Sequence, residues 1–320
     1  MNINKYKGAL VGLIVGDVLG VPAEFKTRRE LKEQPILDMV GYGTHHQPLG
    51  TWSDDSSMTL ATIEWLSELS EQEVNYHLLM DKFCDWLLHG AYTAHNDTFD
   101  YGGATCNALY RYMNQSEPLD CGGTAAHTNG NGSLMRILPA ALWVKDGLLK
   151  KEVKAKQFIE EMSALTHAHE RSKLGCFLYA CVVAHLYDKD DDKVNVVAKA
   201  LQQAKQQCIL SDELKHYERL FDVAAFQNLE EDEIKSSGYV VDTLEAALWC
   251  FLNTENYEEC VLKAVNLGDD TDTVGAIAGG LAGLWYGLEA IPQKWLNQLV
   301  KYEWIEVLIH QLIQKEVGEV

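Results

Sequence analysis

Acidic and hydroxyl side chains gather at the start of a long run of small residues near the C-terminal end of the chain. Asp269, Asp270, Asp272 and Thr273 stand at the head of a stretch, 271–286, with the spacing of a tightly packed helix. A helix N-terminus stabilises carboxylates through its free N–H groups. One cap needs only one acceptor, however, and three crowded aspartates repel each other unless a cation lies among them. Because carboxylate and hydroxyl oxygens are ligands of hard cations, the run predicts either a cap or a metal site.

A second acidic helix start lies more than two hundred residues upstream. Ser53, Asp54 and Asp55 precede an amphipathic helix that we predict over 55–69. In a binuclear oxygen site, two ions about 3.5–4 Å apart share bridging carboxylates. Together, the two acidic starts therefore predict a binuclear metal site.

Further motifs follow one another along the chain: GALVGLIVGDVLGVPAEF at 8–25, GTWSDDSSM at 50–58, DYGGAT at 100–105, NGNGSLMR at 129–136, THAH at 166–169, GYVVDTLEAALW at 238–249 and LGDDTDTVGAIAG at 267–279. Over nearly the whole chain, this order resembles the ADP-ribosylglycohydrolase family, which includes dinitrogenase reductase-activating glycohydrolase. The resemblance implies an all-α fold, a compact single-domain orthogonal helical bundle over residues 1–320 with a binuclear metal cleft. It also implies a divalent-metal-dependent hydrolase that cleaves the glycosidic bond of ADP-ribosylated proteins or small ADP-ribose conjugates.

The resemblance assigns roles to individual residues. It implies that two divalent cations, Mg²⁺ or Mn²⁺, are held by Glu24, Ser53, Asp54, Asp55, Asp270, Asp272 and Thr273, and that catalysis uses Glu24, Asp55, Asp100 and Asp270. Taken alone, Glu24 is a solvated carboxylate and Asp100 caps a helix predicted over 102–113. In the family pattern, Glu24 instead enters the metal site as a ligand or base, and Asp100 faces the ribose.

The segment 129–136 has the features of a phosphate-binding loop, because two glycines beside a helix start leave backbone N–H groups exposed. We assign Asn131, Gly132, Ser133 and Leu134 to the substrate, with the Ser133 hydroxyl as an added donor. Arg136, at the end of this motif, has a purely structural interpretation: a buried arginine that pairs with a carboxylate in the core.

Three histidines lie in or near these motifs. The family pattern places His167 in the substrate pocket and leaves His169 as a capping residue. His45, in the polar loop 30–48, receives no role.

Composition limits the class of protein. The chain has 320 residues, 47% of them hydrophobic, and a net charge of −20, which disfavours nucleic acid and anionic membranes as partners. Eight cysteines without a C-x-x-C pair indicate reduced thiols in a cytoplasmic protein. We expect no export signal because Asp17 interrupts the first apolar run, and no stretch of about 20 apolar residues to span a membrane. We expect a monomer.

Apolar periodicity predicts helices over 6–20, 56–69, 74–89, 102–113, 171–186, 194–206, 213–225, 242–252, 257–265, 271–286 and 294–315, and no strand. Asp242 and Glu245 have the spacing of a capping box. The polar stretches 90–103, 116–132 and 188–192 are the only candidate breaks, and the motifs straddle them, so we predict one domain.

Two other functions remain open: a catalytically silent ADP-ribose-binding or structural protein of the same fold, as in the lens crystallins of the family, and a metal-dependent phosphoester hydrolase. The complete acidic set argues against a silent protein. The leaving group could be arginine, serine, an acetyl ester or a nucleobase, and the D-D-x-D-T form of the second motif favours arginine.

Overall fold

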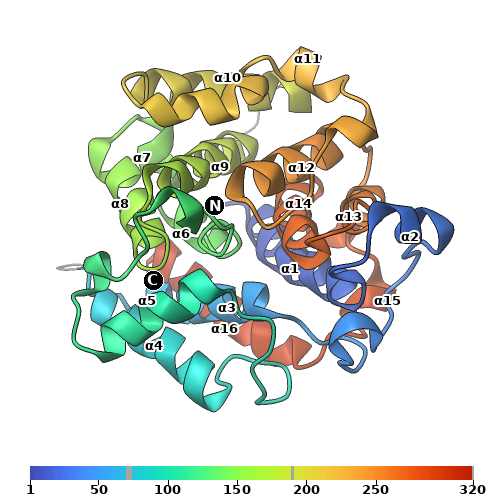
Figure 1. Ribbon diagram of the computed structural model, residues 1–320, viewed down its shortest axis with the longest axis horizontal. Helices are drawn as coiled ribbons and strands as arrows, with labels where there is room; N and C mark the ends of the chain where they lie inside the picture. The colour runs from blue at the N-terminus through green and yellow to red at the C-terminus, as the bar shows by residue number, and fades with distance from the viewer. Residues whose placement is uncertain (70–73, 189–190, 319–320) are drawn as a thin grey trace.

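The computed structural model describes residues 1–69, 74–188 and 191–318 (Figure 1). Within these residues, the regular secondary structure is helical. Only three isolated β-bridges occur there, so the all-α prediction is confirmed. Residues 189–190, inside the predicted break 188–192, lie outside the described residues. The α-helices longer than eight residues are α1 Ile3–Gly20, α3 Asp54–Glu68, α4 Tyr76–His89, α5 Gly103–Met113, α8 Val153–Ala164, α9 Glu170–Asp188, α10 Lys193–Gln207, α12 Val240–Leu252, α13 Tyr257–Val265, α14 Thr271–Tyr286 and α16 Tyr302–Val317.

Shorter helices connect them. These are α2 Arg28–Glu33, α6 Leu138–Trp143, α7 Lys145–Leu149, α11 Val223–Gln227 and α15 Gln293–Leu296, with 3₁₀ turns η1 Val21–Ala23, η2 Gly43–His45, η3 Pro118–Asp120, η4 Ala126–Thr128, η5 Asp212–Phe221, η6 Glu231–Glu233 and η7 Leu288–Ala290. In Figure 1, α10 and α11 lie along one edge of the molecule, α4 and α5 along the opposite edge, and α1 and α14 between them.

Helices α1 and α14 pack with their backbones in direct contact. Two rows of glycines face each other, Gly8, Gly12 and Gly16 on α1 and Gly283, Gly279 and Gly275 on α14. A Cβ atom added to Gly16 would lie 2.0 Å from the Gly275 carbonyl oxygen, and one added to Gly279 would lie 2.3 Å from that of Gly12. Because the two helices are antiparallel, the C-terminal end of α1 lies beside the N-terminal end of α14.

The apolar character of α1 is explained by this central position. Residues 3–23 are long and apolar enough to cross a membrane, with a mean hydropathy of 1.4, but 94% of the apolar window is buried inside the molecule. The sequence analysis was therefore wrong that no stretch reaches the length and apolarity of a span. The helix is apolar all round because other helices surround it.

Asp17 fastens the start of α3 to α1. Its carboxylate is fully buried and accepts hydrogen bonds from the backbone N–H groups of Ser53 and Ser56, both at 3.0 Å, and from the Ser56 hydroxyl. N–H groups in the first turn of a helix have no intrahelical partner, so a buried carboxylate from α1 satisfies groups that α3 cannot. This interaction places the second acidic run beside α1.

Several element predictions were wrong for identifiable reasons. The predicted helix 213–225 is the 3₁₀ helix η5 followed by α11, because the Asp222 carboxylate accepts a hydrogen bond from the Ala225 N–H (3.1 Å) and starts a new helix. The predicted helix 294–315 is split into α15 and α16 at Lys301, which has φ = 52°. Helices α6 to α8 were missed, although Ala155, Phe158, Ile159 and Met162 have helical spacing in α8.

The predicted capping box of Asp242 and Glu245 is also wrong. Helix α12 begins at Val240, without a side-chain cap from Tyr239. Glu245 is buried and forms an ion pair with Arg219, with 3.3 Å between Oε2 and Nη1. The packing of that carboxylate against a distant arginine therefore overrides a local capping signal.

The glycine contact generates a stability prediction. Gly16→Ala should lower the free energy of unfolding by about 2–3 kcal/mol, because the added methyl meets the Gly275 backbone and forces the two helices apart. Urea unfolding measures this change. Gly103→Ala is the control, since nothing lies within 4 Å of a Cβ at that helical position; its midpoint should remain unchanged or rise. Equal midpoints for Gly16→Ala and the parent would contradict the close packing.

Candidate active site

Seven carboxylates from four segments of the chain lie close together: Asp17, Glu24, Asp54, Asp55, Asp100, Asp270 and Asp272. Carboxylate oxygens of Glu24, Asp270 and Asp272 all lie within 4.8 Å of one another, and so do oxygens of Asp17, Asp55 and Asp272. The structure therefore brings both predicted acidic runs and Glu24 into one cluster. The Thr273 hydroxyl donates to Asp55 Oδ1 (3.3 Å) and joins the two runs directly.

Helix capping does not account for these carboxylates. Asp270 stands at the N-cap position of α14 but forms no side-chain cap hydrogen bond. Asp55 Oδ2, Asp270 Oδ1 and Asp272 Oδ2 are buried without any hydrogen-bond partner. Buried acceptors without a partner are costly, and hard divalent cations bind such oxygens. The donor set thus fits Mg²⁺ or Mn²⁺.

Ser53 has a role in the helix as well as in the cluster. It is the N-cap residue of α3, and its hydroxyl oxygen accepts from the Asp55 N–H at 3.3 Å. A hydroxyl oxygen has two lone pairs, so the cap leaves one of them for a further interaction. Asp54 and Asp55 occupy the first turn of α3 rather than preceding the helix.

Burial and mutual repulsion raise the pKa values of the clustered carboxyl groups and so favour their protonated forms. Burial, followed by the charges of Asp100 and Asp270, raises the pKa of Glu24 to about 10. Burial chiefly, with neighbouring carboxylates, also raises the pKa values of Asp54, Asp55 and Asp272 well above their usual range. No lysine or arginine forms a salt bridge with these groups in the described part of the chain. A bound cation would therefore stabilise the ionised forms of these carboxyl groups.

His45 is a residue that the sequence analysis missed. Its Nε2 atom contacts Glu24 Oε2 and lies 3.9 Å from Asp100 Oδ2. Thr44 holds this loop in place by donating its hydroxyl to the Glu24 carbonyl oxygen (2.7 Å). No spacing pattern links His45 to Glu24, because the contact depends on how η2 packs on η1. Asp17, which was noted only as an exception in an apolar helix, belongs to the cluster too.

Asp100 is not a helix cap. Gly102 is the N-cap residue of α5, and no side chain caps that helix. Asp100 has φ = 51°, a left-handed conformation that Asp tolerates better than most residues. This conformation accompanies a side chain close to His45, so the capping interpretation of Asp100 was wrong.

The loop 129–134 is connected to the acidic cluster through Asn131. The Asn131 amide donates to Asp270 Oδ2 (2.9 Å) and to the Thr243 hydroxyl (3.0 Å). The N–H groups of Gly132, Ser133 and Leu134 form no hydrogen bond within the described residues. These free donors agree with the predicted anion-binding loop.

The Ser133 hydroxyl does not belong to that donor set. It is fully buried, accepts a hydrogen bond from Ser163 (2.9 Å) and lies 3.4 Å from Cys176 Sγ. The prediction that this hydroxyl adds a donor for the ligand was therefore wrong, because the side chain packs into the core. Leu134 is buried as well, so neither of these side chains is open to a ligand, and Gly132 is the partly exposed residue of 131–134.

His167 lies behind the same loop. A Cβ atom added to Gly132 would lie 2.9 Å from His167 Cε1, and His167 Nδ1 lies 2.9 Å from the Thr166 hydroxyl oxygen. Burial, with the charge of Arg136, lowers the pKa of His167 to about 3, so its ring is neutral. The structure thus places His167 against the predicted substrate loop and outside the carboxylate cluster.

Arg136 is buried beneath this region without an acidic partner. Its Nη2 donates to the Met162 carbonyl oxygen (3.0 Å) and to the Thr166 hydroxyl (2.8 Å), while Nε and Nη1 have no partner. The expected carboxylate pair is absent from the described residues. Its guanidinium instead lies 4.9 Å from the centre of the Phe83 ring.

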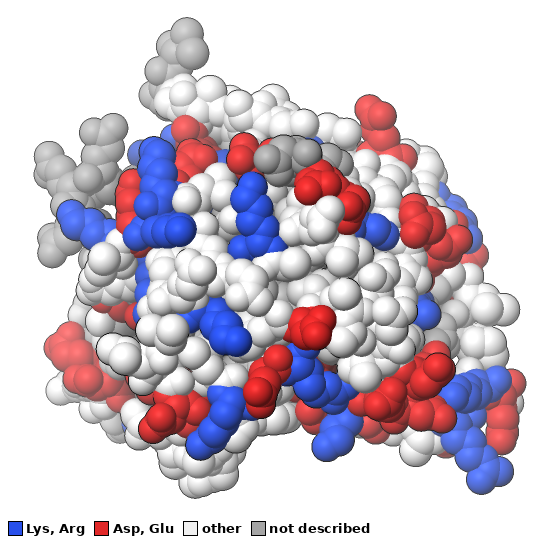
Figure 2. Space-filling view, turned by 90° about the horizontal axis from the view of Figure 1, so that it is seen from above, with Lys and Arg blue, Asp and Glu red and all other residues white. Residues whose placement is uncertain are grey.

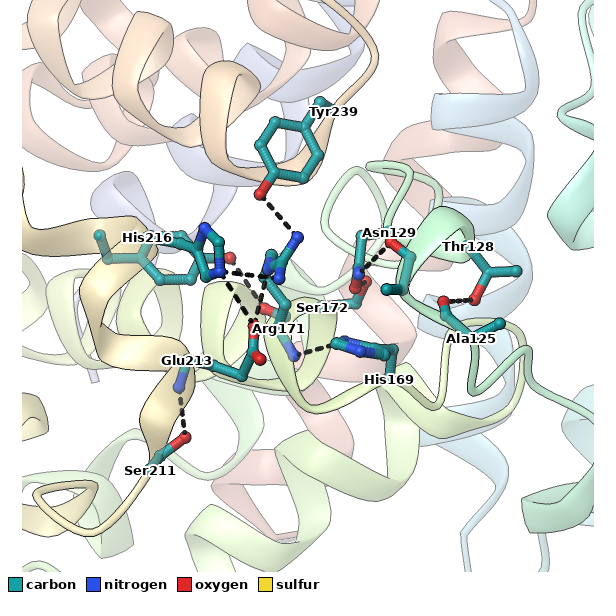
Figure 3. A network of polar contacts seen from close by, with 12 residues as sticks. Ala125, Thr128, Asn129, His169, Arg171, Ser172, Ser211, Glu213, His216 and Tyr239 are labelled. Atoms are coloured by element: carbon teal, nitrogen blue, oxygen red, sulfur yellow. Dashed lines mark hydrogen bonds and ion pairs between the residues drawn. The ribbon is translucent and has the colours of Figure 1, made fainter.

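A polar network holds the base of the loop (Figure 3). Arg171 donates to the Tyr239 hydroxyl (3.0 Å) and to Glu213 (2.7 Å), and the Arg171 N–H donates to His169 Nδ1 (3.1 Å). Ser172 donates to the Asn129 side chain (2.9 Å). His169 is therefore confirmed as a capping residue at the start of α9, and the network joins α9 and the start of α12 to the loop.

A hollow elsewhere in the described residues is lined by carboxylates that form ion pairs. A hollow of about 1020 Å³ near the far end of α3 is lined by Glu64, Trp143 and Lys315, among others, but Glu64 already pairs with Lys82 (2.6 Å) and Tyr92. The face in Figure 2 has basic and acidic side chains interspersed, and no broad basic patch. The unpaired carboxylates thus define the candidate active site.

Comparison with known proteins shows which family this chain resembles over its whole length. A family model described as ADP-ribosylglycohydrolase matches residues 2–319. The chain is 33% identical to "ADP-ribosylarginine hydrolase Tri1" of Serratia proteamaculans (97% of this chain, 79% of the relative) and 29% identical to "ADP-ribosyl-[dinitrogen reductase] glycohydrolase" of Rhodospirillum rubrum (91% and 89%). A solved structure, "ADP-ribosylglycohydrolase-related protein complex", superposes with a TM-score of 0.80 at 29% identity and covers 98% of both chains.

The raised pKa values predict how stability depends on pH. In chelator-treated protein, the free energy of unfolding should fall as the pH rises from about 5 to about 8, because Asp17, with a pKa raised to about 6, and Glu24 bind more protons folded than unfolded. Denaturant titrations at several pH values measure this slope. Saturating Mg²⁺ should reduce it, because a bound cation replaces the protons. A stability that rises with pH in chelator would contradict the assignment.

Proposed function

Because this chain belongs to the ADP-ribosylglycohydrolase family, we propose that it releases ADP-ribose from arginine-linked conjugates with the help of two divalent cations. It is a hydrolase that acts on glycosidic bonds. One observation carries the proposal: buried carboxylate oxygens without partners lie beside a loop with free N–H groups, and Asn131 of that loop donates a hydrogen bond to Asp270.

The metal ligands of the proposal are Glu24, Asp55, Asp270 and Asp272, with Ser53, Asp54 and Thr273 at the edges of the same cluster. Bound Mg²⁺ or Mn²⁺ would supply Lewis-acid stabilisation of developing negative charge. Three unpartnered buried oxygens from two separate helix starts support this assignment.

The chain's own groups account for substrate orientation. A diphosphate is anionic, and the N–H groups of Gly132, Ser133 and Leu134 are free donors for it. The Asn131 bridge to Asp270 fixes the position of this loop relative to the carboxylates. With the diphosphate at the loop, the distal ribose lies toward Asp100 and the cluster, which is where we propose that the glycosidic bond breaks.

The carboxylates also suit the reaction itself. Glycosidic cleavage passes through an oxocarbenium-like transition state, and carboxylates near the ribose stabilise its positive charge. With divalent cations bound in place of its proton, Glu24 could act as the base for the attacking water, and His45 is in contact with the same carboxylate. Asp100 approaches the same His45 atom, with 3.9 Å between Oδ2 and Nε2, and atoms of Glu24, His45 and Asp100 lie within 4.8 Å of one another. We propose that Asp100 orients the ribose hydroxyls.

Arginine as the leaving group rests on the relatives that are described as ADP-ribosylarginine hydrolases. Hydrolysis by a cytoplasmic enzyme also agrees with eight cysteines that form no disulfide. The full set of carboxylates argues against a silent ADP-ribose-binding protein.

A substrate panel tests the proposed function. Purified protein with Mg²⁺ or Mn²⁺ should release ADP-ribose from arginine-linked conjugates faster than from serine-linked or acetyl-ester conjugates, as measured by mass spectrometry of free ADP-ribose. EDTA should abolish release and added Mg²⁺ should restore it, because hard oxygen ligands select such ions. Full turnover in metal-free protein, or no release from any conjugate, would overturn the proposal.

Asp272→Asn distinguishes a ligand from a helix-terminal residue. Asp272 Oδ1 accepts from the Thr273 N–H (3.0 Å), while Oδ2 is buried and free. Removal of the charge should weaken Mg²⁺ binding and lower turnover by orders of magnitude, yet raise the stability of the chelator-treated protein by relieving repulsion. Calorimetry of Mg²⁺ binding and urea unfolding measure the two effects.

Asp269→Asn is the matched control in the same motif. The Asp269 side chain is exposed, and its left-handed backbone (φ = 59°) suits asparagine. This variant should keep Mg²⁺ affinity and turnover. If Asp272→Asn released ADP-ribose at a near-normal rate in saturating Mg²⁺, Asp272 would have only a structural role.

A further inference from the structure

Phe25 combines two unfavourable features beside the cluster. Its backbone has φ = 63° and its side chain is 68% exposed. A left-handed conformation is rare for bulky residues and costs free energy, and exposed aromatic surface forgoes hydrophobic stabilisation. Such outliers concentrate at functional sites, and Phe25 directly follows Glu24.

The conformation of Phe25 is fixed by its surroundings. The Phe25 N–H donates to the Asp269 carbonyl oxygen (2.7 Å), and the Asp269 N–H donates to the Lys26 carbonyl oxygen (2.8 Å). This reciprocal pair joins the turn after Glu24 to the turn before Asp270. The ring is therefore presented by a braced turn rather than by a free loop.

Three rings form a row over the site. The ring centres of Phe25 and His45 are 5.9 Å apart, and those of His45 and Phe99 are 5.2 Å apart. Phe25 and Phe99 each adjoin a site carboxylate in the chain, Glu24 and Asp100, and the His45 ring contacts the first and approaches the second. The row thus borders the carboxylates where a leaving group departs.

The negative charge of the carboxylate cluster favours a cationic leaving group beside this row of rings. Seven carboxylates outweigh the four positive charges of two divalent cations if all are ionised, and no lysine or arginine of the described chain pairs with them. A cationic leaving group would reduce this excess. Planar guanidinium groups also stack on aromatic faces.

We propose that Phe25, at the outer end of the Phe25–His45–Phe99 row, determines leaving-group specificity by stacking against the guanidinium of an arginine conjugate. This inference rests on the proposed function, because it requires an ADP-ribose conjugate in the cleft. It adds a contact made by the leaving group alone, whereas ADP-ribose is held by the loop and the carboxylates.

The test compares Phe25→Leu and Phe25→Trp with the parent in saturating Mg²⁺. Phe25→Leu keeps apolar volume but lacks a π face, so kcat/KM for an arginine-linked conjugate should fall on the order of tenfold, while calorimetry shows unchanged affinity for free ADP-ribose. Phe25→Trp should retain parental kcat/KM. Tyr42→Leu is the matched control, because Tyr42 is also exposed (65%) with φ = 69° but has no ring contact with the row in the described residues.

The outcomes separate the two proposals. If the parent releases no ADP-ribose from the arginine conjugate, the proposed function and this inference both fail. If the parent is active and Phe25→Leu matches it, or if Phe25→Leu loses ADP-ribose affinity in equal measure, only the role of Phe25 is overturned. Equal losses in Phe25→Leu and Tyr42→Leu would also overturn it, since a general surface effect would then explain the change.

Discussion

The contact between the glycine rows of α1 and α14 is the constraint on which the site depends. Because backbone meets backbone at Gly16 and Gly275, the two helices have one register and one separation. That register brings Gly20 against Asp272, with 2.3 Å from an added Cβ to the Asp272 Cα atom. The end of α1, with Glu24 just beyond it, is thereby held at the start of α14, and Asp17 in turn positions α3.

This arrangement explains how mutually repelling carboxylates remain together in the folded chain. Burial of a charge without a partner is costly, and Asp55, Asp270 and Asp272 each keep a buried oxygen without one. Packing along the two central helices offsets that cost. Core packing therefore holds together carboxylates that repel one another. Such a local conflict is typical of functional sites, where a bound ligand relieves the repulsion.

Local patterns predicted the acidic runs, the tightly packed helix over 271–286 and the helical class, because each depends on residues that are close together in the sequence. The contact of His45 with Glu24 could not be predicted, since it depends on the packing of two turns 21 residues apart. The loop 129–134 shows the same limit. Its glycines predicted free N–H groups, but only the packing of α9 decides that the Ser133 hydroxyl turns toward Cys176. The alternative interpretation of Asp100 as a helix cap is wrong, because Gly102 occupies that position.

The two hydrogen bonds that join residues 25 and 26 to residue 269 use only main-chain groups. A side-chain replacement at position 25 therefore leaves the link between the two acidic turns intact. Glu24 and Asp270 keep their relative positions whichever residue stands between Glu24 and Lys26. The relative position of Glu24 and Asp270 thus does not depend on the side chain at position 25, and that side chain can be changed without altering the link between the two acidic turns.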